Sequence, residues 1–482
     1  MCQVIDDPVM AADNRNIAVV GTTDGAPFFS DKHRGCWPFV FRVGNLPDAL
    51  SFLTRNTHVA LISANEYFSK DPKTGEIVRY VRGPKSLHPH MLIISDDLYF
   101  GYHTGYLIAD WTIPRGVPGR VFCCRTTLLL WTGDYPALGK SSGMKHKGNR
   151  LCHWCEIECP KDKALQRQVV SQYRRFLRPR HQWRQQRWAG GTELRPQPPN
   201  RSHESILRDA QANQAHTGYK KDAPHKLTSV KEVCPLGYLF GFDLCWDFAP
   251  DLFHIVEGLF QSHIVPLMKG ERTPKKPQRT GNMASTEWKK IKQRFEAEKS
   301  LVASWVLPKS VRRILDTRTR YLGGETGWFG SGRAICKRTG SLKAYDWLKI
   351  AEGAWQYIFW GLYDDLPHKQ ESLYALLAAL SAIVGSCAHA TNADDAPDTY
   401  STRTDMLKLK DTVANAMALF DRDFPATEKA GVFHIILHVP DFIHKWGSVR
   451  NGWCFYGERS LHIRIHIVRI CEHICRRMYT FM

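Results

Sequence analysis

The sequence contains no apolar run long enough to cross a lipid bilayer. Its longest runs, such as residues 374–385, are much shorter than the roughly 20 apolar residues of a transmembrane helix. The opening residues are acidic and lack an apolar centre, so we expect no secretory signal peptide. Without such a signal, the 14 cysteines indicate reduced thiols rather than a disulfide framework. We therefore expect a folded protein that neither spans a membrane nor depends on disulfides.

Acidic residues are scarce relative to basic ones. The chain has 66 Lys and Arg against 47 Asp and Glu, which gives a formal net charge of +19. This excess favours a polyanionic partner, nucleic acid before an acidic membrane surface. The alternative is a basic protein whose charge only keeps it soluble. The 482 residues, 43% of them hydrophobic, suffice for one large unit or for two to three domains.

Apolar patterning predicts a sheet followed by helices. Four runs bounded by turn residues predict strands at residues 16–25, 36–47, 90–102 and 125–138. An Arg-rich stretch with Gly-Gly and Pro-Pro follows, and we predict a solvent-exposed linker or poorly ordered loop over roughly residues 189–226. Helical periodicity then predicts mostly helices over residues 285–425.

Two aspartates stand where an apolar run gives way to a turn. Asp24 lies in VVGTTDG and Asp134 in LLLWTGDYPAL. A carboxylate at the end of a core strand is held rigidly and can face an open cleft, where two or three such groups bind Mg²⁺ through oxygen. Taken singly, each aspartate is explained more simply as a turn-forming residue, so neither decides the function alone.

The stretch LCHWCEIECP contains the spacing of half a zinc site, at Cys152 and Cys155. His434 and His438 stand one helical turn apart and would complete a closed Cys₂His₂ set, which suits structural zinc. About 280 residues separate the two halves, so such a site would join distant segments. The alternatives are ordinary thiols with core or surface histidines, or ligation involving Cys159, Asp251, His254 or His444.

Several segments resemble one known family in their order. They are TTDGAPFF, CWPFVFRVGNLP, TTLLLWTGDYPALGKSSGMKHKGNRLCHWC, YRRFLRPRHQWR, DLFHIVEG and the closing FHIILHV with WGSVRNGWCFYGERSLH. Together they resemble the transposases of CACTA (En/Spm-type) DNA transposons, from about Ile17 to Ile470. The layout is also similar to that of Transib transposases and the antigen-receptor recombinase. The resemblance is weakest in the basic loop and in the helical stretch.

The resemblance implies an α/β fold, a ribonuclease-H-like mixed β-sheet core with a long, mainly helical insertion before the last catalytic acid. The implied parts are the first part of the catalytic core at 1–160, a basic and partly disordered loop at 161–235, a core helix segment at 236–270, a helical insertion at 271–430 and the C-terminal part of the core at 431–482.

The resemblance also implies a DDE triad at Asp24, Asp134 and Glu458, which would hold two Mg²⁺ or Mn²⁺ ions. The reaction it implies is nicking of DNA at a transposon end, followed by attack of the freed 3′-hydroxyl on target DNA. In the family the CxxC and HxxxH motifs fall on the four residues of the proposed structural zinc site. The rival carboxylates are Glu257 for the third position and Asp96 and Asp97 for the first two.

Two further sets of residues match the family. The Arg-rich segment is expected to lie along DNA phosphates while its aromatic residues stack on bases, although a solvated loop would have the same composition. Its expected DNA-binding residues are Arg174, Arg175, Arg178, Arg180, Trp183, Arg184 and Arg187, with Tyr173, Phe176 and Trp188 beside them. Asp251 and His254 match a DxxH motif and are expected to support the core, with a helix N-cap as the alternative role of Asp251.

The partners implied by the resemblance are transposon ends and target DNA, in the nucleus, with a homodimer or larger assembly and no membrane. Unlike the family, the chain has little sequence before Asp24 and ends soon after Glu458, so we expect a truncated, decayed or host-adopted copy. Two other hypotheses remain open. One is a transposase-derived DNA-binding protein without catalysis, and the other is a metal-stabilised RNA- or DNA-binding protein of different ancestry.

Overall fold

The chain is described by a computed structural model. The described residues are 7–27, 35–46, 56–64, 67–70, 74, 76–81, 86–145, 148–185, 194–218, 224–279, 283–324, 334–337, 339–385 and 403–447. Three residues singled out from the sequence, Arg187, Trp188 and Glu458, lie outside this set.

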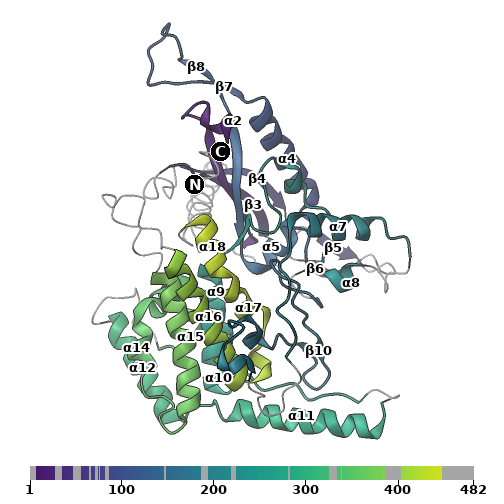
Figure 1. Cartoon of the computed structure of the whole chain (residues 1–482), viewed down its shortest axis with the longest axis vertical. Helices are drawn as coiled ribbons and strands as arrows, with labels where there is room; N and C mark the ends of the chain where they lie inside the picture. Colours follow the sequence, from purple (N-terminus) through teal and green to yellow (C-terminus); the bar gives the residue numbers. More distant parts are fainter. Residues whose placement is uncertain are drawn as a thin grey trace, which may run out of the picture.

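A mixed β-sheet forms one half of the molecule and helices form the other (Figure 1). The strand order is β12-β9-β1-β3-β4, and the short β2 (Ala26–Pro27) extends the β1–β3 hairpin by pairing with β3. Strands β1, β9 and β12 are parallel, whereas β3 is antiparallel to both β1 and β4. The strands are β1 (Ile17–Thr23), β3 (Gly35–Val43), β4 (Thr57–Ala64), β9 (Thr126–Gly133) and β12 (Phe248–Pro250). The predicted α/β fold with a ribonuclease-H-like mixed sheet is confirmed.

Strand β9 lies between β12 and β1, at the centre of the parallel half of the sheet, and it is apolar on both faces. Leu128, Leu130 and Trp131 are all buried, as expected for a strand that is covered by helices on both sides. Gly21 of β1 lies directly beside the Trp131 ring, and a Cβ at this position would approach the ring to 2.4 Å. Glycine is therefore required where β1 passes this tryptophan.

The third predicted strand is wrong, because residues 90–102 lie within helix α4 (His88–His103). Its buried side chains, Met91, Ile94, Ser95 and Tyr102, follow a helical rather than an alternating spacing. The apolar residues between them, such as Ile93, are solvent-exposed, and they gave the sequence the appearance of a strand. Helix α4 packs against β9 through the main hydrophobic core.

The region predicted as a loop over residues 189–226 contains a well-formed helix, α7 (His203–Gln214). Ser202 caps it, and Ser202 and Ser205 exchange hydrogen bonds in a capping box. Ile206 and Ala210 are buried, which attaches this helix to the core. The loop prediction is therefore wrong for this stretch, because low mean hydropathy concealed a narrow apolar face.

The helical half surrounds a continuous helix in which a π-helical turn (Phe260–Ile264) joins α9 to α10. Its buried residues belong to the same hydrophobic core as the sheet. None of the described helices is long and apolar enough to span a membrane. The helices are α9 (Leu252–Leu259), α10 (Val265–Lys269), α11 (Ser285–Ala303), α12 (Lys309–Gly324), α13 (Ala344–Lys349), α14 (Trp355–Ile358), α15 (Pro367–Gly385), α16 (Arg403–Asp423), α17 (Gly431–Ile435) and α18 (Val439–Trp446).

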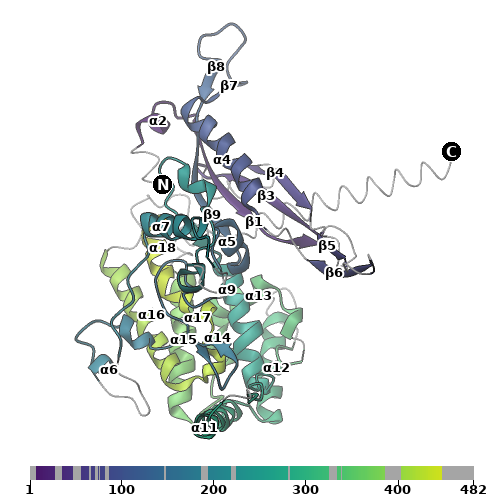
Figure 2. The same cartoon turned by 90° about the vertical axis from the view of Figure 1, so that its right-hand side faces the viewer.

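Smaller elements connect these two halves or project from them. Strands β7 and β8 form a hairpin that extends away from the body in both views (Figures 1 and 2). The remaining elements are α2 (Pro8–Ala11), β5 (Tyr67–Lys70), β6 (Ile77–Val81), β7 (Tyr106–Ala109), β8 (Val121–Cys124), α5 (Tyr135–Ser141), β10 (Lys161–Asp162), β11 (Arg167–Gln168), α6 (Gln182–Gln185) and α8 (His225–Thr228).

Helix α18 returns from the helical half to the edge of the sheet. Lys445 Nζ lies 2.6 Å from Asp247 Oδ1, and the Trp446 indole N–H donates to the carbonyl of Trp246 at 3.1 Å. The carboxylate of Asp247 also accepts a hydrogen bond from the Asp243 backbone N–H. These contacts fix the end of the described chain beside β12.

Asp247 gives a testable pH dependence of stability. Burial raises the pKa of Asp247 from 3.8 to about 6, although Lys445 opposes this. The folded state thus holds this proton more tightly than the unfolded chain, so the contribution of Asp247 to stability falls as the pH rises from about 4 to 6 and is constant above. This difference in pKa between the folded and unfolded states corresponds to a loss of about 3 kcal/mol of stability over that pH range. Asp247→Asn should remove this fall, measured by denaturant unfolding at several pH values. Exposed Asp96→Asn serves as the control, and an unaltered pH dependence in Asp247→Asn would contradict the assignment.

Candidate active site and metal cluster

Three aspartates lie in a row at the carboxyl ends of the three parallel strands. Thr22 pairs with Thr132 between β1 and β9, so Asp24 and Asp134, each two residues further on, stand at equivalent positions. Pro250 pairs with Gly133 between β12 and β9, which places Asp251 at the next position of the same row. The end of a parallel sheet is where ligands bind in α/β proteins. The register therefore brings the first two predicted catalytic acids together.

Local hydrogen bonds orient both acids. Asp134 is the N-cap of α5, and its Oδ1 accepts the backbone N–H of Ala137 at 2.7 Å. Asp24 Oδ1 accepts the backbone N–H of Gly25 at 2.6 Å, where the β1–β3 hairpin is interrupted. Both carboxylates are partly exposed, as a site open to solvent requires.

The charges of both acids act on the side chain of Lys140. Burial lowers the pKa of Lys140, and Lys231 lowers it further, whereas the charges of both Asp134 and Asp24 act to raise it. The Lys140 ammonium lies 4.1 Å from the centre of the Trp37 ring. The Lys140 ammonium is therefore within electrostatic range of both carboxylates. Two oxygen donors of this kind, at a rigid and solvent-facing strand edge, fit the ligand preference of Mg²⁺ or Mn²⁺.

Asp251 is buried, and both of its carboxylate oxygens are used within the first turn of α9. Oδ1 accepts the backbone N–H of Phe253 at 3.0 Å, and Oδ2 lies 2.5 Å from His254 Nδ1. Asp251 is therefore the N-cap of α9, the alternative that the sequence left open. Asp251 follows the paired Pro250 at the end of β12, and its bonds to Phe253 and His254 lie within the first turn of α9.

The third acid is not fixed by the described structure, because Glu458 lies outside it. The rival Glu257 lies in α9, which leads away from the sheet edge into the helical half (Figures 1 and 2). The rivals Asp96 and Asp97 lie on exposed positions of α4 and not at the row of aspartates.

The second group of predicted residues forms a compact buried cluster. Cys152, Cys155, His434 and His438 are all buried, and their ligand atoms lie within 4.8 Å of one another. Cys152 Sγ is 3.4 Å from His438 Nε2, Cys155 Sγ is 3.2 Å from His434 Nε2, and the two Nε2 atoms are 3.1 Å apart. The structure thus joins segments separated by 279 and 286 residues.

These distances fit a tetrahedral zinc ion. With Zn–S of about 2.3 Å and Zn–N of about 2.05 Å, a regular tetrahedron has S···N edges of about 3.6 Å and an N···N edge of about 3.3 Å. The three edges given above are within about 0.4 Å of these values. No other group of three or more His, Cys, Asp or Glu ligands meets the same distance criterion among the described residues. The set of two thiols and two imidazoles leaves no ligand position for water, which is typical of structural zinc.

The protonation states also suit metal binding. Burial raises the pKa of the Cys152 thiol, but the hydrogen bond from Cys155 and the charges of His438 and His434 outweigh it, so the pKa lies well below its ordinary value. Burial and the neighbouring Cys152 raise the pKa of Cys155 well above its ordinary value. Burial lowers the pKa of His434, which favours the neutral imidazole that a metal ion requires. The Cys155 thiol would release its proton when metal binds.

Aromatic rings enclose the cluster. The Tyr173 ring stacks on His434 with centroids 6.0 Å apart and an interplanar angle of 12°. Trp154, between the two cysteines, contacts the rings of both His438 and Phe442. Its backbone N–H also donates to Cys152 Sγ at 3.4 Å. Water is thereby excluded from the cluster.

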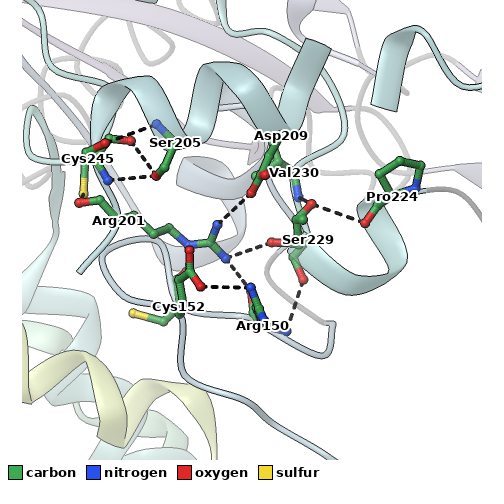
Figure 3. Close-up of polar contacts among 12 residues, drawn as sticks. Arg150, Cys152, Arg201, Ser205, Asp209, Pro224, Ser229, Val230 and Cys245 are labelled. Atoms are coloured by element: carbon green, nitrogen blue, oxygen red, sulfur yellow. Dashed lines mark hydrogen bonds and ion pairs between the residues drawn. The ribbon is translucent and has the colours of Figure 1, made fainter. Parts of the chain in front are cut away.

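Arg201, which the sequence gave no reason to select, holds the cysteine loop in place (Figure 3). Its guanidinium is buried and donates to the carbonyls of Cys152, Arg150 and Thr228 at 3.2, 3.4 and 2.8 Å. Asp209 of α7 lies 3.6 Å from the guanidinium and offsets its charge. Helix α7 and the cysteine loop are therefore coupled through one arginine. Only the Arg-rich composition around it was visible in the sequence.

The expected DNA-binding residues fall into three groups. Arg174 and Arg175 are buried in the 3₁₀ helix Tyr173–Phe176, beside the metal cluster, so their side chains do not lie on the surface. Trp183 packs against Leu177, and Arg184 donates to the Leu177 carbonyl. The remaining residues are exposed Arg178, which forms an ion pair with Asp411, exposed Arg180, and Arg187 outside the described residues.

Comparison with known proteins bears on this arrangement. Residues 89–213 match the family model described as Transposase family tnp2. This segment resembles a transposase. It spans α4, the β7–β8 hairpin, β9 with Asp134, both cysteines of the metal cluster, and α7. No match to the chain is found among curated proteins. The match supports a transposase family, with DNA as the partner that such a family implies.

Proposed function

We propose that the chain is the catalytic part of a DDE-type transposase of the CACTA (En/Spm) type, or a remnant of one. In this proposal it nicks DNA at transposon ends and transfers the freed 3′-hydroxyl to target DNA. The observation that carries the proposal is the register of β1 and β9 in the mixed sheet, in which the paired Thr22 and Thr132 each stand two residues before one of the proposed acids, Asp24 and Asp134. The match of residues 89–213 to a transposase family supports it independently.

The residues of this chain divide the work. Asp24 and Asp134, with Glu458 as the proposed third acid, would hold two Mg²⁺ or Mn²⁺ ions. Such ions supply an activated water or hydroxyl and neutralise charge on the leaving oxygen of a phosphodiester. The Cys₂His₂ cluster would hold structural zinc and carry no chemistry. It would keep the segment after Asp134 against the segment that leads toward Glu458.

Exposed basic residues would position the DNA. Arg178 and Arg180 are exposed and follow the buried start of the Arg-rich segment, and we assign phosphate contacts to them. The same role is proposed for half-buried Arg184 and for Arg187, which lies outside the described residues. Nuclear localisation and assembly of two or more copies belong to the same proposal, because two transposon ends must be cut together.

The test is strand cleavage by the zinc-loaded chain. Supercoiled plasmid and a labelled duplex are incubated with Mg²⁺, with Mn²⁺ and with EDTA, and nicked products are resolved on denaturing gels. The proposal expects nicking that requires Mg²⁺ or Mn²⁺. DNA binding without nicking under any of these conditions would instead favour a transposase-derived DNA-binding protein.

The identity of the third acid gives a separate prediction. We expect Glu458→Gln to reduce metal-dependent nicking by at least about 10³-fold, because it removes one metal ligand. Glu257→Gln is the matched control and should retain nicking within a few-fold, since α9 leads away from the acids. The assignment would be reversed if Glu257→Gln lost nicking while Glu458→Gln kept full activity. The comparison requires that both variants have the same thermal stability.

A further inference from the structure

One face of the β7–β8 hairpin, called here the bare face, is exposed to solvent. Residues opposite each other in an antiparallel pair share a face, so the pairs Leu107–Cys123 and Ala109–Val121 define one side. Leu107 is 81% and Val121 61% exposed. The other face packs: Tyr106 contacts the Phe100 ring of α4 and donates to Asp97. Such exposed apolar side chains mark an interaction surface.

Two hydrogen-bonded turns shape the tip that joins these two strands. Val117 N–H donates to the Pro114 carbonyl and Arg120 N–H to the Val117 carbonyl, which closes two successive turns. Gly116 and Gly119 occupy the third position of each turn with a φ of +84°, as type II turns require. The backbone of the tip is therefore pre-organised and would lose little entropy on binding.

The charge of the tip is positive. Asp110 is the only acid in residues 105–125, and its carboxylate accepts from Thr112 and lies 3.5 Å from Arg15 NH1. Arg15 also donates to the Gly119 carbonyl and covers the Phe122 ring, so it braces the hairpin against the sheet. Among the described residues, Arg115 and Arg120 have no carboxylate partner, so the tip attracts a polyanion.

The tip also presents an aromatic ring. Trp111 is 77% exposed, and the Arg120 guanidinium lies 4.8 Å from the centre of its ring. An apolar side chain flanked by arginines on a β-hairpin is the combination with which minor-groove binders wedge between base steps. Residues 110–120 contain no Asn or Gln, the side chains that read adenine in the major groove. Width and deformability of the groove, rather than base identity, would decide binding.

The hairpin lies at the opposite end of β9 from the acids. β8 ends at Cys124 and β9, eight residues long, begins at Thr126 and ends next to Asp134. At about 3.3 Å per residue this is about 26 Å, or about eight base pairs of duplex. DNA held at the carboxyl edge can therefore extend to the hairpin.

We propose that the β7–β8 hairpin, with residues 110–120 as its tip, inserts into the minor groove of duplex DNA about eight base pairs or more from the cleavage position. Arg115 and Arg120 contact phosphates on the two sides of the groove, and Trp111 is the apolar wedge. The proposal rests on the proposed function in taking duplex DNA as the ligand and the sheet edge with Asp24 and Asp134 as the cleavage position. A second copy of the chain is the alternative occupant of the bare face.

Binding is measured with the full zinc-loaded chain and a 40-base-pair duplex of mixed sequence, without Mg²⁺, by fluorescence anisotropy across a series of KCl concentrations. The double variant Arg115→Gln/Arg120→Gln should bind about 10- to 100-fold more weakly, and the slope of log K against log[KCl] should fall by about 1.8, since each phosphate contact contributes about 0.9. Trp111→Ser should lose about tenfold without a change of slope. Netropsin, which fills the minor groove, should weaken the wild type but not a variant with residues 110–120 replaced by Asn-Gly.

Matched controls use the same residue types in the helical half. Arg313→Gln and Trp360→Ser are exposed substitutions there and should bind like the wild type. Variants that all bind within twofold of the wild type overturn the proposal. So does a dimeric wild type that becomes monomeric in Leu107→Asp with unchanged DNA affinity, because the hairpin is then a contact between copies. Because Mg²⁺ is absent, this experiment measures DNA binding and not cleavage. A chain that cuts no DNA can therefore still support the hairpin proposal, and a chain that cuts DNA normally can overturn it.

Discussion

Cys152→Ser is expected to abolish zinc binding and to lower the melting temperature by 10 °C or more. The variant removes a thiolate from a closed four-ligand set, and a three-ligand remnant holds zinc far more weakly. Structural zinc contributes about 10–16 kcal/mol of apparent binding free energy in zinc-finger peptides. Only part of this need be lost here to unfold the protein, because total stabilities are about 5–15 kcal/mol. Zinc content by mass spectrometry and melting with and without a chelator measure the two effects.

Cys159→Ser is the matched control for this substitution. Cys159 is equally buried and lies four residues after Cys155, but it is not part of the metal cluster. Its thiol donates instead to the Ile157 carbonyl. We expect this variant to keep one zinc per chain and to lose only about 1–2 kcal/mol, as buried substitutions commonly do. Full zinc content in Cys152→Ser, or in the double variant His434→Ala/His438→Ala, would contradict the cluster as the metal site.

Asp134→Asn is expected to reduce metal-dependent nicking by at least about 10³-fold with little change in stability. The amide cannot supply the negative charge that binds two divalent cations. Its side-chain oxygen can still accept the Ala137 N–H, because Asn is as good an N-cap as Asp. The substitution therefore separates chemistry from folding. Gel assays of nicking and thermal melting of the same preparation give the two readouts.

Asp24→Asn should have the same effect, because the strand register makes the two acids equivalent. Asp96→Asn, on exposed α4, is the control and should nick like the wild type. If Asp134→Asn retains wild-type nicking, the site lies elsewhere. If the wild type binds Mg²⁺ weakly and never nicks while the variants bind DNA normally, the chain is a DNA-binding remnant.

The pairing of Asp24 with Asp134 was within reach of the sequence because each ends an apolar run. Two such runs that become adjacent parallel strands bring their carboxyl ends to one edge. Periodicity and turns marked each aspartate singly, whereas their assignment as a pair came from the resemblance to the transposase family. The Cys₂His₂ set was accessible for a similar reason, since ligand spacing survives in the sequence even when about 280 residues intervene. What spacing does not encode is the packing that brings the halves together.

The wrong predictions from the sequence share one physical cause. The sequence does not reveal which side chains are exposed to solvent and which are buried. Helix α4 was taken for a strand because its outer face carries Leu92, Ile93 and Phe100, which are exposed and not in the core. The same uncertainty affected Arg174, Arg175 and Arg201, because the sequence places no partner near them. The prediction also missed β4, whose apolar residues lie between stretches rich in turn formers.

The metal cluster makes folding depend on the order of synthesis. Cys152 and Cys155 leave the ribosome long before His434 and His438, because the paired ligands stand 279 and 286 positions apart in the sequence. At 5–20 residues per second, translation of this interval takes about 15 to 60 seconds. During that time the thiols lack their imidazole partners, and the core around Trp154 lacks its cover. Zinc held by this cluster would therefore reach its final geometry only after nearly the whole described chain has been made.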